Sequence, residues 1–252
     1  GSGPGDVWAV GDRGTIIHWD GGSWALAASP TTAYLYSVSG SGPGDVWAGG
    51  TFDLIHWDGG TWAREPVPFA GPTSRVGVWS LARNDAVALG WSSGVLRWNG
   101  TQWQVMAPSP TPKALEGVWA SGPGDIWVGS SDGMYEWNGA SWSGWNPSFR
   151  FATGVRIGGS GPNDVWAVYD FAEQFARWTG VGWSIIRTPD GGAGKTFAEA
   201  IAGCGPNNVL AVGRAGDIMR WNGSRWSLES SGIAGISGGW TTNIWRSVWG
   251  SS

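Results

Sequence analysis

The side chains best suited to catalysis or metal binding are scarce in this chain. It holds two histidines, His18 and His56, and one cysteine, Cys204. The usual zinc sites need about four His or Cys ligands at short spacings. Two distant histidines and one cysteine far along the chain cannot supply such a set. A single cysteine also excludes an internal disulfide.

Two further patterns resemble catalytic motifs but lack an essential part. Residues 192–196, Gly-Ala-Gly-Lys-Thr, look like the end of a phosphate-binding loop. The full pattern needs a glycine at position 189, which is Pro189, and no helix is predicted to follow. No Gly-x-Ser-x-Gly segment appears in the strand-to-helix context that a nucleophilic serine requires.

One enzyme hypothesis stays open. Charged side chains recur on the first strand of several repeats and would line a central channel, where they form an axial site or only solvate it. They are Arg75, Glu116, Arg156, Glu199 and Arg246.

The elements that must position these residues come from a repeat. An acid or amide recurs at Asp6, Asp45, Asp85, Asp125, Asp164 and Asn208, at intervals of 39, 40, 40, 39 and 44 residues. A period near 40 residues is typical of propellers and solenoids. Each repeat contains four short β-branched and aromatic segments, which we call strands A to D, separated by Gly, Pro, Asn and Asp. The strand C–D turn reads Trp-Asp-Gly or Trp-Asn-Gly, which is a strong hairpin signal.

The sequence therefore predicts an all-β fold: a six-bladed β-propeller with four-stranded antiparallel blades in a single domain, residues 1–252. The chain begins at a strand B, and residues 244–251 match strand A. We expect this last strand to join the first three and close blade 1. His18 and His56 take a strand C place that other repeats fill with Arg or Glu, so we expect both to be exposed polar residues.

Comparison of the six repeats separates scaffold tryptophans from the rest. A tryptophan ends strand C and another begins strand D in every repeat, so these twelve are expected to form the core. Strand B adds Trp8, Trp47, Trp127 and Trp166. Trp91, Trp145, Trp240 and Trp245 are not required by the repeat and are candidates for exposed binding residues; the alternative is that some of them fill gaps at blade ends.

The connections also divide into two classes. The A–B and C–D turns are nearly constant, whereas the B–C and D–A connections vary, and binding residues concentrate on variable loops held by a rigid frame. We therefore place a ligand-binding face at the B–C and D–A loops. The predicted ligand-binding residues are Trp91, Ser92, Trp145, Asn146, Tyr169, Asp170, Phe171, Trp240, Asn243 and Trp245.

Composition limits the partners. The net charge is −4 and the pI is about 5.1, which argues against nucleic acid and anionic membranes as partners. No apolar run approaches the roughly 20 residues of a membrane span. No loop clusters the carboxylates that calcium needs, so no cofactor and no metal are expected. We expect a monomer.

The pattern Leu-Tyr-Ser-Val-Ser-Gly at 35–40, Asp-Val-Trp-Ala at 45–48 and Ile-His-Trp-Asp-Gly-Gly-Thr-Trp at 55–62 resembles tectonin-type repeats. The likeness extends over all six repeats, although the Ser-Gly-Pro-Gly-Asp turn departs from the usual tectonin spelling. Tectonins are largely lectins and surface-recognition proteins. The resemblance thus implies a bacterial propeller that binds glycans or a cell-surface ligand, in an extracellular or cell-surface setting.

Three functions follow as hypotheses. The first is a lectin-like propeller, because indole rings stack on the apolar faces of sugars while Asp, Asn, Ser and Arg bind their hydroxyls. The second is a protein-interaction scaffold that uses the same face in a larger contiguous patch. The third is an enzyme with an axial site. We expect a non-enzymatic recognition protein.

The closing strand gives the first testable prediction. Deletion of residues 244–252 should abolish cooperative thermal unfolding, because blade 1 would lose a strand and expose a sheet edge. Circular dichroism melting curves of the parent and the truncated chain measure this directly. A truncated protein that melts with the parent's midpoint and sharpness would contradict the closure.

Overall fold

The computed structural model describes residues 3–68, 76–90, 94–145, 155–168, 174–188, 198–213 and 218–229. Within these ranges the chain forms strands β1–β23 and one short 3-10 helix, η1 (Asp12–Gly14). The strands pair antiparallel, in chain order, in six separate sheets. Five sheets have four strands each, and the described part of the first has three. The chain is therefore an all-β, six-bladed β-propeller, as the repeat predicts.

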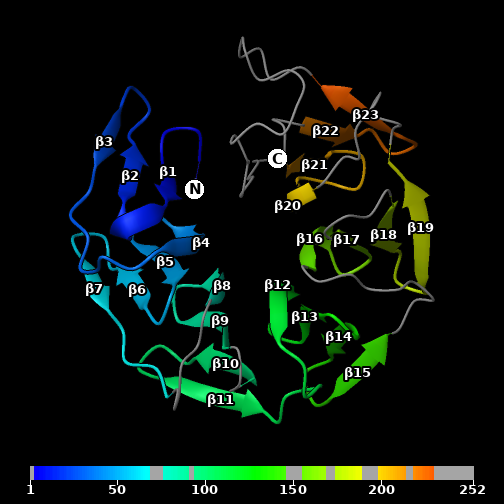
Figure 1. Cartoon of the computed structure of the whole chain (residues 1–252), viewed down its shortest axis with the longest axis horizontal. Coiled ribbons are helices and arrows are strands. Elements are labelled where there is room, and N and C mark those ends of the chain that lie inside the picture. The colour runs from blue at the N-terminus through cyan, green and yellow to red at the C-terminus, as the bar shows by residue number, and fades with distance from the viewer. Residues whose placement is uncertain are drawn as a thin grey trace. The chain divides into compact units, whose positions relative to one another are not determined.

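Blades 1 to 3 follow one another from the N-terminus (Figure 1). Their strands are β1 (Val7–Val10), β2 (Ile16–Trp19) and β3 (Trp24–Leu26); β4 (Leu35–Gly42), β5 (Asp45–Gly50), β6 (Leu54–Trp57) and β7 (Trp62–Arg64); and β8 (Gly77–Ala82), β9 (Asp85–Gly90), β10 (Gly94–Trp98) and β11 (Trp103–Ala107).

Blades 4 to 6 repeat the same order. Their strands are β12 (Leu115–Gly122), β13 (Asp125–Ser130), β14 (Gly133–Trp137) and β15 (Trp142–Trp145); β16 (Arg156–Gly161), β17 (Asp164–Val168), β18 (Gln174–Trp178) and β19 (Trp183–Arg187); and β20 (Ala198–Gly203), β21 (Val209–Gly213), β22 (Ile218–Trp221) and β23 (Trp226–Glu229).

The chain divides into two compact units. Unit 1 comprises residues 1–118, 122–124 and 139–141, and so holds blades 1 to 3 with parts of blade 4. Unit 2 holds the remainder. The predicted single domain stays a prediction, and the predicted closing strand at 244–251 lies outside the described residues.

The C–D hairpin turns explain one constant element of the repeat. Asp20 Oδ1 accepts hydrogen bonds from the backbone N–H groups of Gly22 and Ser23, both at 2.8 Å, while Gly21 adopts a φ of 96°. A side-chain acceptor and a residue that tolerates positive φ are both needed to close so tight a turn. The Asn222 turn repeats the arrangement in blade 6, with bonds of 3.0 Å to the N–H groups of Ser224 and Arg225.

Neighbouring blades are joined by tryptophan rings. In unit 1 the strand B ring of Trp8 lies 5.0 Å from Trp57 and 5.3 Å from Trp62, two rings of the next blade's C–D hairpin. Trp127 and Trp166 make the same pair of contacts in unit 2. Such aromatic pairs contribute roughly 0.5–1.5 kcal/mol each beyond the burial of area. The strand B tryptophans are thus wedges between blades.

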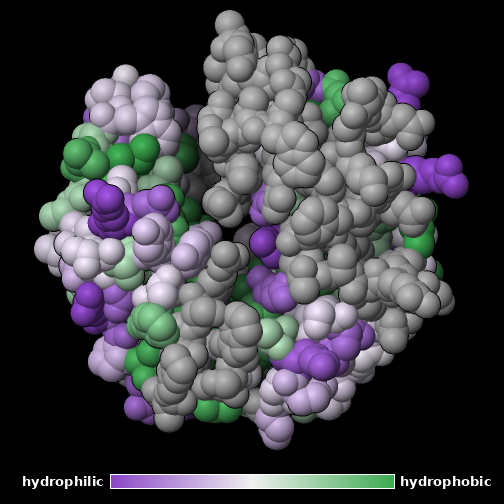
Figure 2. All heavy atoms as spheres, viewed as in Figure 1, coloured by the Kyte–Doolittle hydropathy of each residue, from purple (hydrophilic) through white to green (hydrophobic). Residues whose placement is uncertain are grey.

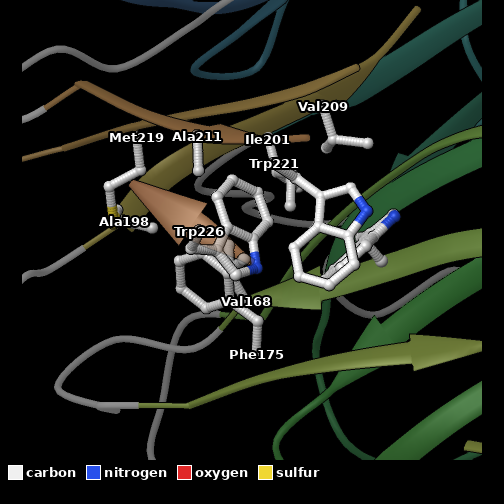
Figure 3. Packing of buried hydrophobic residues seen from close by; sticks show 10 residues of the cluster. Val168, Phe175, Ala198, Ile201, Val209, Ala211, Met219, Trp221 and Trp226 are labelled. Carbon is white, nitrogen blue, oxygen red and sulfur yellow. The ribbon is translucent and has the colours of Figure 1, made fainter. Parts of the chain in front are cut away.

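The core of unit 2 shows how closely blades 5 and 6 approach (Figure 3). Phe175 meets Trp226 edge to face at 4.9 Å, inside a cluster that includes Trp166 and Met219. A Cβ added at Gly158 on β16 would lie 2.3 Å from the Ile201 carbonyl on β20. Only a residue without a side chain fits there, because the two inner strands pack backbone against backbone.

Most of the twelve hairpin tryptophans are buried or half-buried, as expected, but Trp24 is an exception. Its side chain is 49% exposed, whereas Trp226 at the same repeat position is 5% exposed. Within unit 1 no blade precedes β1–β3, and no strand B tryptophan of that unit packs on Trp24. The expectation that all twelve form the core is therefore wrong for this residue.

The two equivalent tryptophans form a matched pair for a stability test. We expect Trp226→Ala to lower the free energy of unfolding by about 3–5 kcal/mol, the usual cost of deleting a large buried aromatic side chain. Trp24→Ala should cost less than about 1 kcal/mol. Urea denaturation followed by circular dichroism provides both values, and equal losses would contradict the assignment of core and surface.

Candidate functional site

The acid at the start of each strand B is a structural centre rather than a free reactive group. Asp45 accepts hydrogen bonds from Ser41 at 2.5 Å and from Ser80 of the next blade at 3.0 Å. Its other oxygen lies 2.8 Å from His56 Nε2. These hydrogen bonds lower the pKa of Asp45 against the opposing effect of burial, which is the largest single influence. The repeat acid therefore ties together an A–B turn, a C strand and the neighbouring blade.

Both histidines belong to this network. His18 Nε2 lies 2.7 Å from Asp6, and its ring stacks on Trp8 with centroids 4.1 Å apart and planes at 20°. His56 stacks on Trp47 in the same way, at 4.0 Å and 18°. Both histidines are half-buried. The expectation of exposed polar residues is wrong, because the strand C side chain lies flat on the strand B indole.

Arginine replaces histidine in three other blades and bonds the same repeat position. Arg177 also lies over the ring of Trp166, with its guanidinium carbon 5.1 Å from the centroid. The pairs are Arg97–Asp85 at 2.8 Å, Arg177–Asp164 at 2.8 Å and Arg220–Asn208 at 2.7 Å. Each pair joins strands B and C of one blade, and Arg97 and Arg177 also donate to the Pro123 and Pro206 carbonyls of the next blade, at 3.3 and 3.2 Å.

Blade 4 departs from this rule. Glu136 stands where the other five blades have His or Arg, so two acids, Asp125 and Glu136, share the position. Asp125 accepts a hydrogen bond from the indole N–H of Trp127 at 2.8 Å, and Glu136 accepts one from Trp145 at 3.3 Å. Burial, with the charge of Asp125 as a smaller cause, raises the pKa of Glu136 against the effect of the Trp145 bond.

Trp145 is the one predicted ligand-binding residue that lies within the described chain. It is half-buried at the end of β15, and its ring centroid lies 4.7 Å from that of Trp178 in the next blade. Together with its bond to Glu136, this contact gives Trp145 a packing role at the blade 4–blade 5 junction. Its predicted ligand role stays a prediction. The other nine predicted residues, namely Trp91, Ser92, Asn146, Tyr169, Asp170, Phe171, Trp240, Asn243 and Trp245, lie outside the described residues.

Two of the predicted axial charges lie together in unit 2. Arg156 on β16 approaches Glu199 on β20, with Nη2 and Oε2 3.8 Å apart, and Glu199 is only 5% exposed. Glu116 is half-buried on β12 in unit 1, whereas Arg75 and Arg246 fall outside the described residues. A buried carboxylate is tolerated in a folded protein only when a partner of opposite charge, here the Arg156 guanidinium, lies beside it.

The described part of the variable face is most complete at blades 1 and 2, within unit 1. The D–A connection between β3 and β4 is bonded to the B–C loops of both blades. The Gly14 N–H donates to the Ala33 carbonyl at 2.7 Å, and the Thr51 N–H donates to the Tyr34 carbonyl at 2.8 Å. The connection is thus held from both sides.

A buried threonine strengthens this frame. The Thr31 hydroxyl donates to Asp53 Oδ2, and Arg64 Nη2 lies 3.1 Å from the same hydroxyl and 3.2 Å from Asp53. The Ala33 N–H donates to Thr31 at 3.0 Å. Arg64 and Asp53 are therefore engaged with each other and with the connection, and these bonds tie the loops together.

This frame displays three side chains at the surface. Tyr34 is 49% exposed, Phe52 is 57% exposed, and Arg13 on η1 is also exposed. Arg13 and Phe52 each stand seven residues after the repeat acid and are the only described non-glycine residues with positive φ, 56° and 64°. A bulky residue in this region is uncommon and strained, and such residues cluster at functional sites.

Figure 1 shows η1 as the short blue coil between β1 and β2, on the side turned toward the viewer. In the same view, Figure 2 shows strongly hydrophilic residues (purple) beside residues of intermediate hydropathy (pale) over blades 1 and 2. The loop residues 12–13 and 51–53 belong to the face that the sequence predicts for binding.

Tyr34 carries no sequence signal of its own, because a single tyrosine before strand A is equally typical of a core residue. Only its exposure in the structure identifies it as a surface residue.

No group of three or more His, Cys, Asp and Glu side chains suited to a metal ion occurs among the described residues. None of those residues lies in a helix with the length and hydropathy that a membrane crossing requires.

No protein-family model matches the chain, and no curated protein sequence matches it. Solved structures do. A streptogramin B lyase structure is 16% identical over 92% of this chain and 81% of its own, with a TM-score of 0.75. The WD40 β-propeller domain of Doa1 is 12% identical over 98% and 83%, with a TM-score of 0.72. YCF48 bound to D1 peptide is 19% identical over 90% and 78%, with a TM-score of 0.68.

These comparisons place the chain in the class of β-propellers. At identities below 20% they show the shared fold and no common activity. The three neighbours include a lyase, a WD40 domain and a peptide-bound protein, so the fold alone does not select a function.

The exception in blade 4 provides a pH-dependent prediction. The raised pKa of Glu136 means that its ionisation disfavours the folded state. This cost is full above the folded pKa and absent below the unfolded value near 4.5. Glu136→Gln should therefore raise the free energy of unfolding at pH 7, by about 0.5–1 kcal/mol, and leave it unchanged at pH 3. Urea titrations at the two pH values measure the difference.

The equivalent position in blade 5 is the matched control. Arg177→Gln should lower the free energy of unfolding at pH 7, by about 1–3 kcal/mol, because Asp164 loses a charged hydrogen bond. The same sign for both substitutions would contradict the roles assigned to the two residues.

Proposed function

We propose that this chain is a non-enzymatic recognition propeller that binds glycans in a lectin-like manner through its B–C and D–A loops. The observation that carries the proposal is the pair of exposed aromatic rings, Tyr34 and Phe52, on loops held rigid by mutual hydrogen bonds. Aromatic rings provide stacking surface for the apolar faces of sugars, and rigid loops reduce the entropy lost on binding.

The placement of the other polar groups supports a binding role. The described acid–cation pairs of the strand B and C network are bonded to each other and to the scaffold, which suits them to holding blades. The proposal extends to the loop residues named from the sequence, including Trp91, Tyr169 and Trp240. A tectonin-like relationship and an extracellular or cell-surface location belong to the same proposal and rest on the sequence resemblance.

A peptide is the second candidate ligand. One similar structure is described as YCF48 bound to D1 peptide, so a propeller of this shape accommodates a peptide. The two candidates differ in footprint, because a protein partner covers about 800 Å² of a surface and a sugar needs only a small local site.

We expect weak binding of individual sites to glycans, with a Kd of about 0.1–1 mM, because a shallow stack and a few solvent-exposed hydrogen bonds supply only about 4–5 kcal/mol. Titration of the purified chain with hits from a glycan array measures this value. EDTA should leave the affinity unchanged. Selective binding of peptides instead of glycans would favour the second candidate.

The face itself is testable by blocking it. In a Cys204→Ser background, Thr32→Cys places a thiol on the exposed D–A connection, and Thr101→Cys places one on an exposed C–D turn at the other end of a blade. Attachment of a maleimide polyethylene glycol at position 32 should abolish binding to the array, and attachment at 101 should not. The reverse result would contradict the assignment of the face.

A further inference from the structure

Arg13, Tyr34 and Phe52 are exposed together on the described loops of blades 1 and 2. The three residues are adjacent because of their backbone bonds: Tyr34 lies between Ala33, bonded to Gly14, and Leu35, which donates to the Gly11 carbonyl at 3.0 Å. On its other side, the Tyr34 carbonyl accepts the Thr51 N–H. The tyrosine therefore stands between the loop that carries Arg13 and the loop that carries Phe52.

A second tyrosine extends the aromatic surface. The ring of Tyr36 lies 6.5 Å from that of Tyr34, with the planes at 18°, and its hydroxyl accepts a hydrogen bond from Thr51 at 3.3 Å. Two nearly parallel rings with hydroxyls, beside the bonded loop that carries the exposed Phe52, offer stacking area edged by hydrogen-bonding groups. This combination suits a sugar ring, which has apolar C–H faces and a polar rim.

The charges around this surface cancel. Arg13 is exposed and forms no ion pair with another described residue, but the exposed carboxylate of Asp12 precedes it directly. Arg64, the other nearby cation, is engaged by Asp53 and Thr31. An anionic ligand would meet the Asp12 charge, and a cationic ligand would meet the Arg13 charge, whereas neutral hydroxyls can bond to both groups.

We infer that Arg13, Tyr34 and Phe52 form a binding site for a neutral glycan, with Tyr34 and Phe52 supplying the stacking surface and Asp12 and Arg13 bonding hydroxyls. This inference rests on the recognition function proposed above and specifies its site and ligand class. The left-handed backbone at Arg13 and Phe52 projects both side chains from the frame, at a cost in conformational energy that a merely structural loop would avoid by using glycine.

The backbone geometry supplies a substitution that removes the ring without endangering the fold. Phe52→Gly deletes the aromatic side chain and relieves the strain of a φ of 64°, so its melting temperature should equal or exceed that of the parent. Tyr34→Ala removes the central ring, and Tyr34→Phe keeps it without the hydroxyl. Val181→Ala alters an exposed apolar side chain on a C–D turn and is the control.

The experiment probes an array of neutral oligosaccharides of glucose, mannose, galactose and N-acetylglucosamine, with sialylated and sulfated glycans alongside. The parent should bind neutral glycans. Phe52→Gly and Tyr34→Ala should each weaken that binding at least tenfold, while Tyr34→Phe and Val181→Ala stay within twofold of the parent.

Each alternative result has a distinct meaning. If the parent binds neutral glycans and both ring deletions retain full affinity, the site lies elsewhere on the face, and this inference is wrong while the proposed function stands. Binding restricted to sialylated or sulfated glycans overturns the neutral ligand class. If the parent binds no glycan on the array, the proposed function is wrong and this inference falls with it.

Discussion

A blade of this protein can bury its faces only against its neighbours, and in blades 1, 2, 4 and 5 a strand B tryptophan wedge does so. The strand B rings of Trp8, Trp47, Trp127 and Trp166 each enter the next blade's C–D hairpin and meet two further indoles there. Four short strands alone do not form a stable unit, because a small sheet exposes too much apolar surface. Stability therefore resides in the junctions between successive blades, and the wedge position sets their spacing.

The wedge also determines what the polar residues can do. Stacking a strand C histidine or arginine on the indole brings its nitrogen atoms to the acid that opens strand B, as in the Asp45–His56 and Asp164–Arg177 pairs. Ring, basic side chain and acid thus form one unit in blades 1, 2 and 5, whereas the ring position holds Val87 in blade 3 and Leu210 in blade 6. Glu136 breaks the unit in blade 4, where tryptophan N–H groups bond the two acids instead. Residues that look like candidates for chemistry in the sequence are consequently part of the scaffold.

With both kinds of group committed to the scaffold, the recognition that we propose is left to the loops at one end of the blades. The Thr31, Asp53 and Arg64 cluster holds a D–A connection against the blade 2 B–C loop, and backbone bonds hold it against the blade 1 loop. This frame tolerates the positive φ of Arg13 and Phe52. A strained backbone persists only where surrounding bonds enforce it. The exposed rings of Tyr34 and Phe52, which we propose as binding groups, are therefore carried on loops bonded to each other, an arrangement that lowers the entropy cost of binding.

The sequence by itself determined the fold class, the strand order, the hairpin turns and which tryptophans belong to the repeat, because a period near 40 residues and the Asp-Gly and Asn-Gly turns depend on local chemistry alone. It also led us to propose the variable loops as the binding face, which stays a prediction. The tertiary structure decided which individual side chains are covered. It buried the histidines on indoles, packed Trp145 against Trp178, left Trp24 exposed and raised Tyr34 to the surface. The physical reason is that exposure is a property of contacts between blades and loops distant in the chain, which no local pattern records.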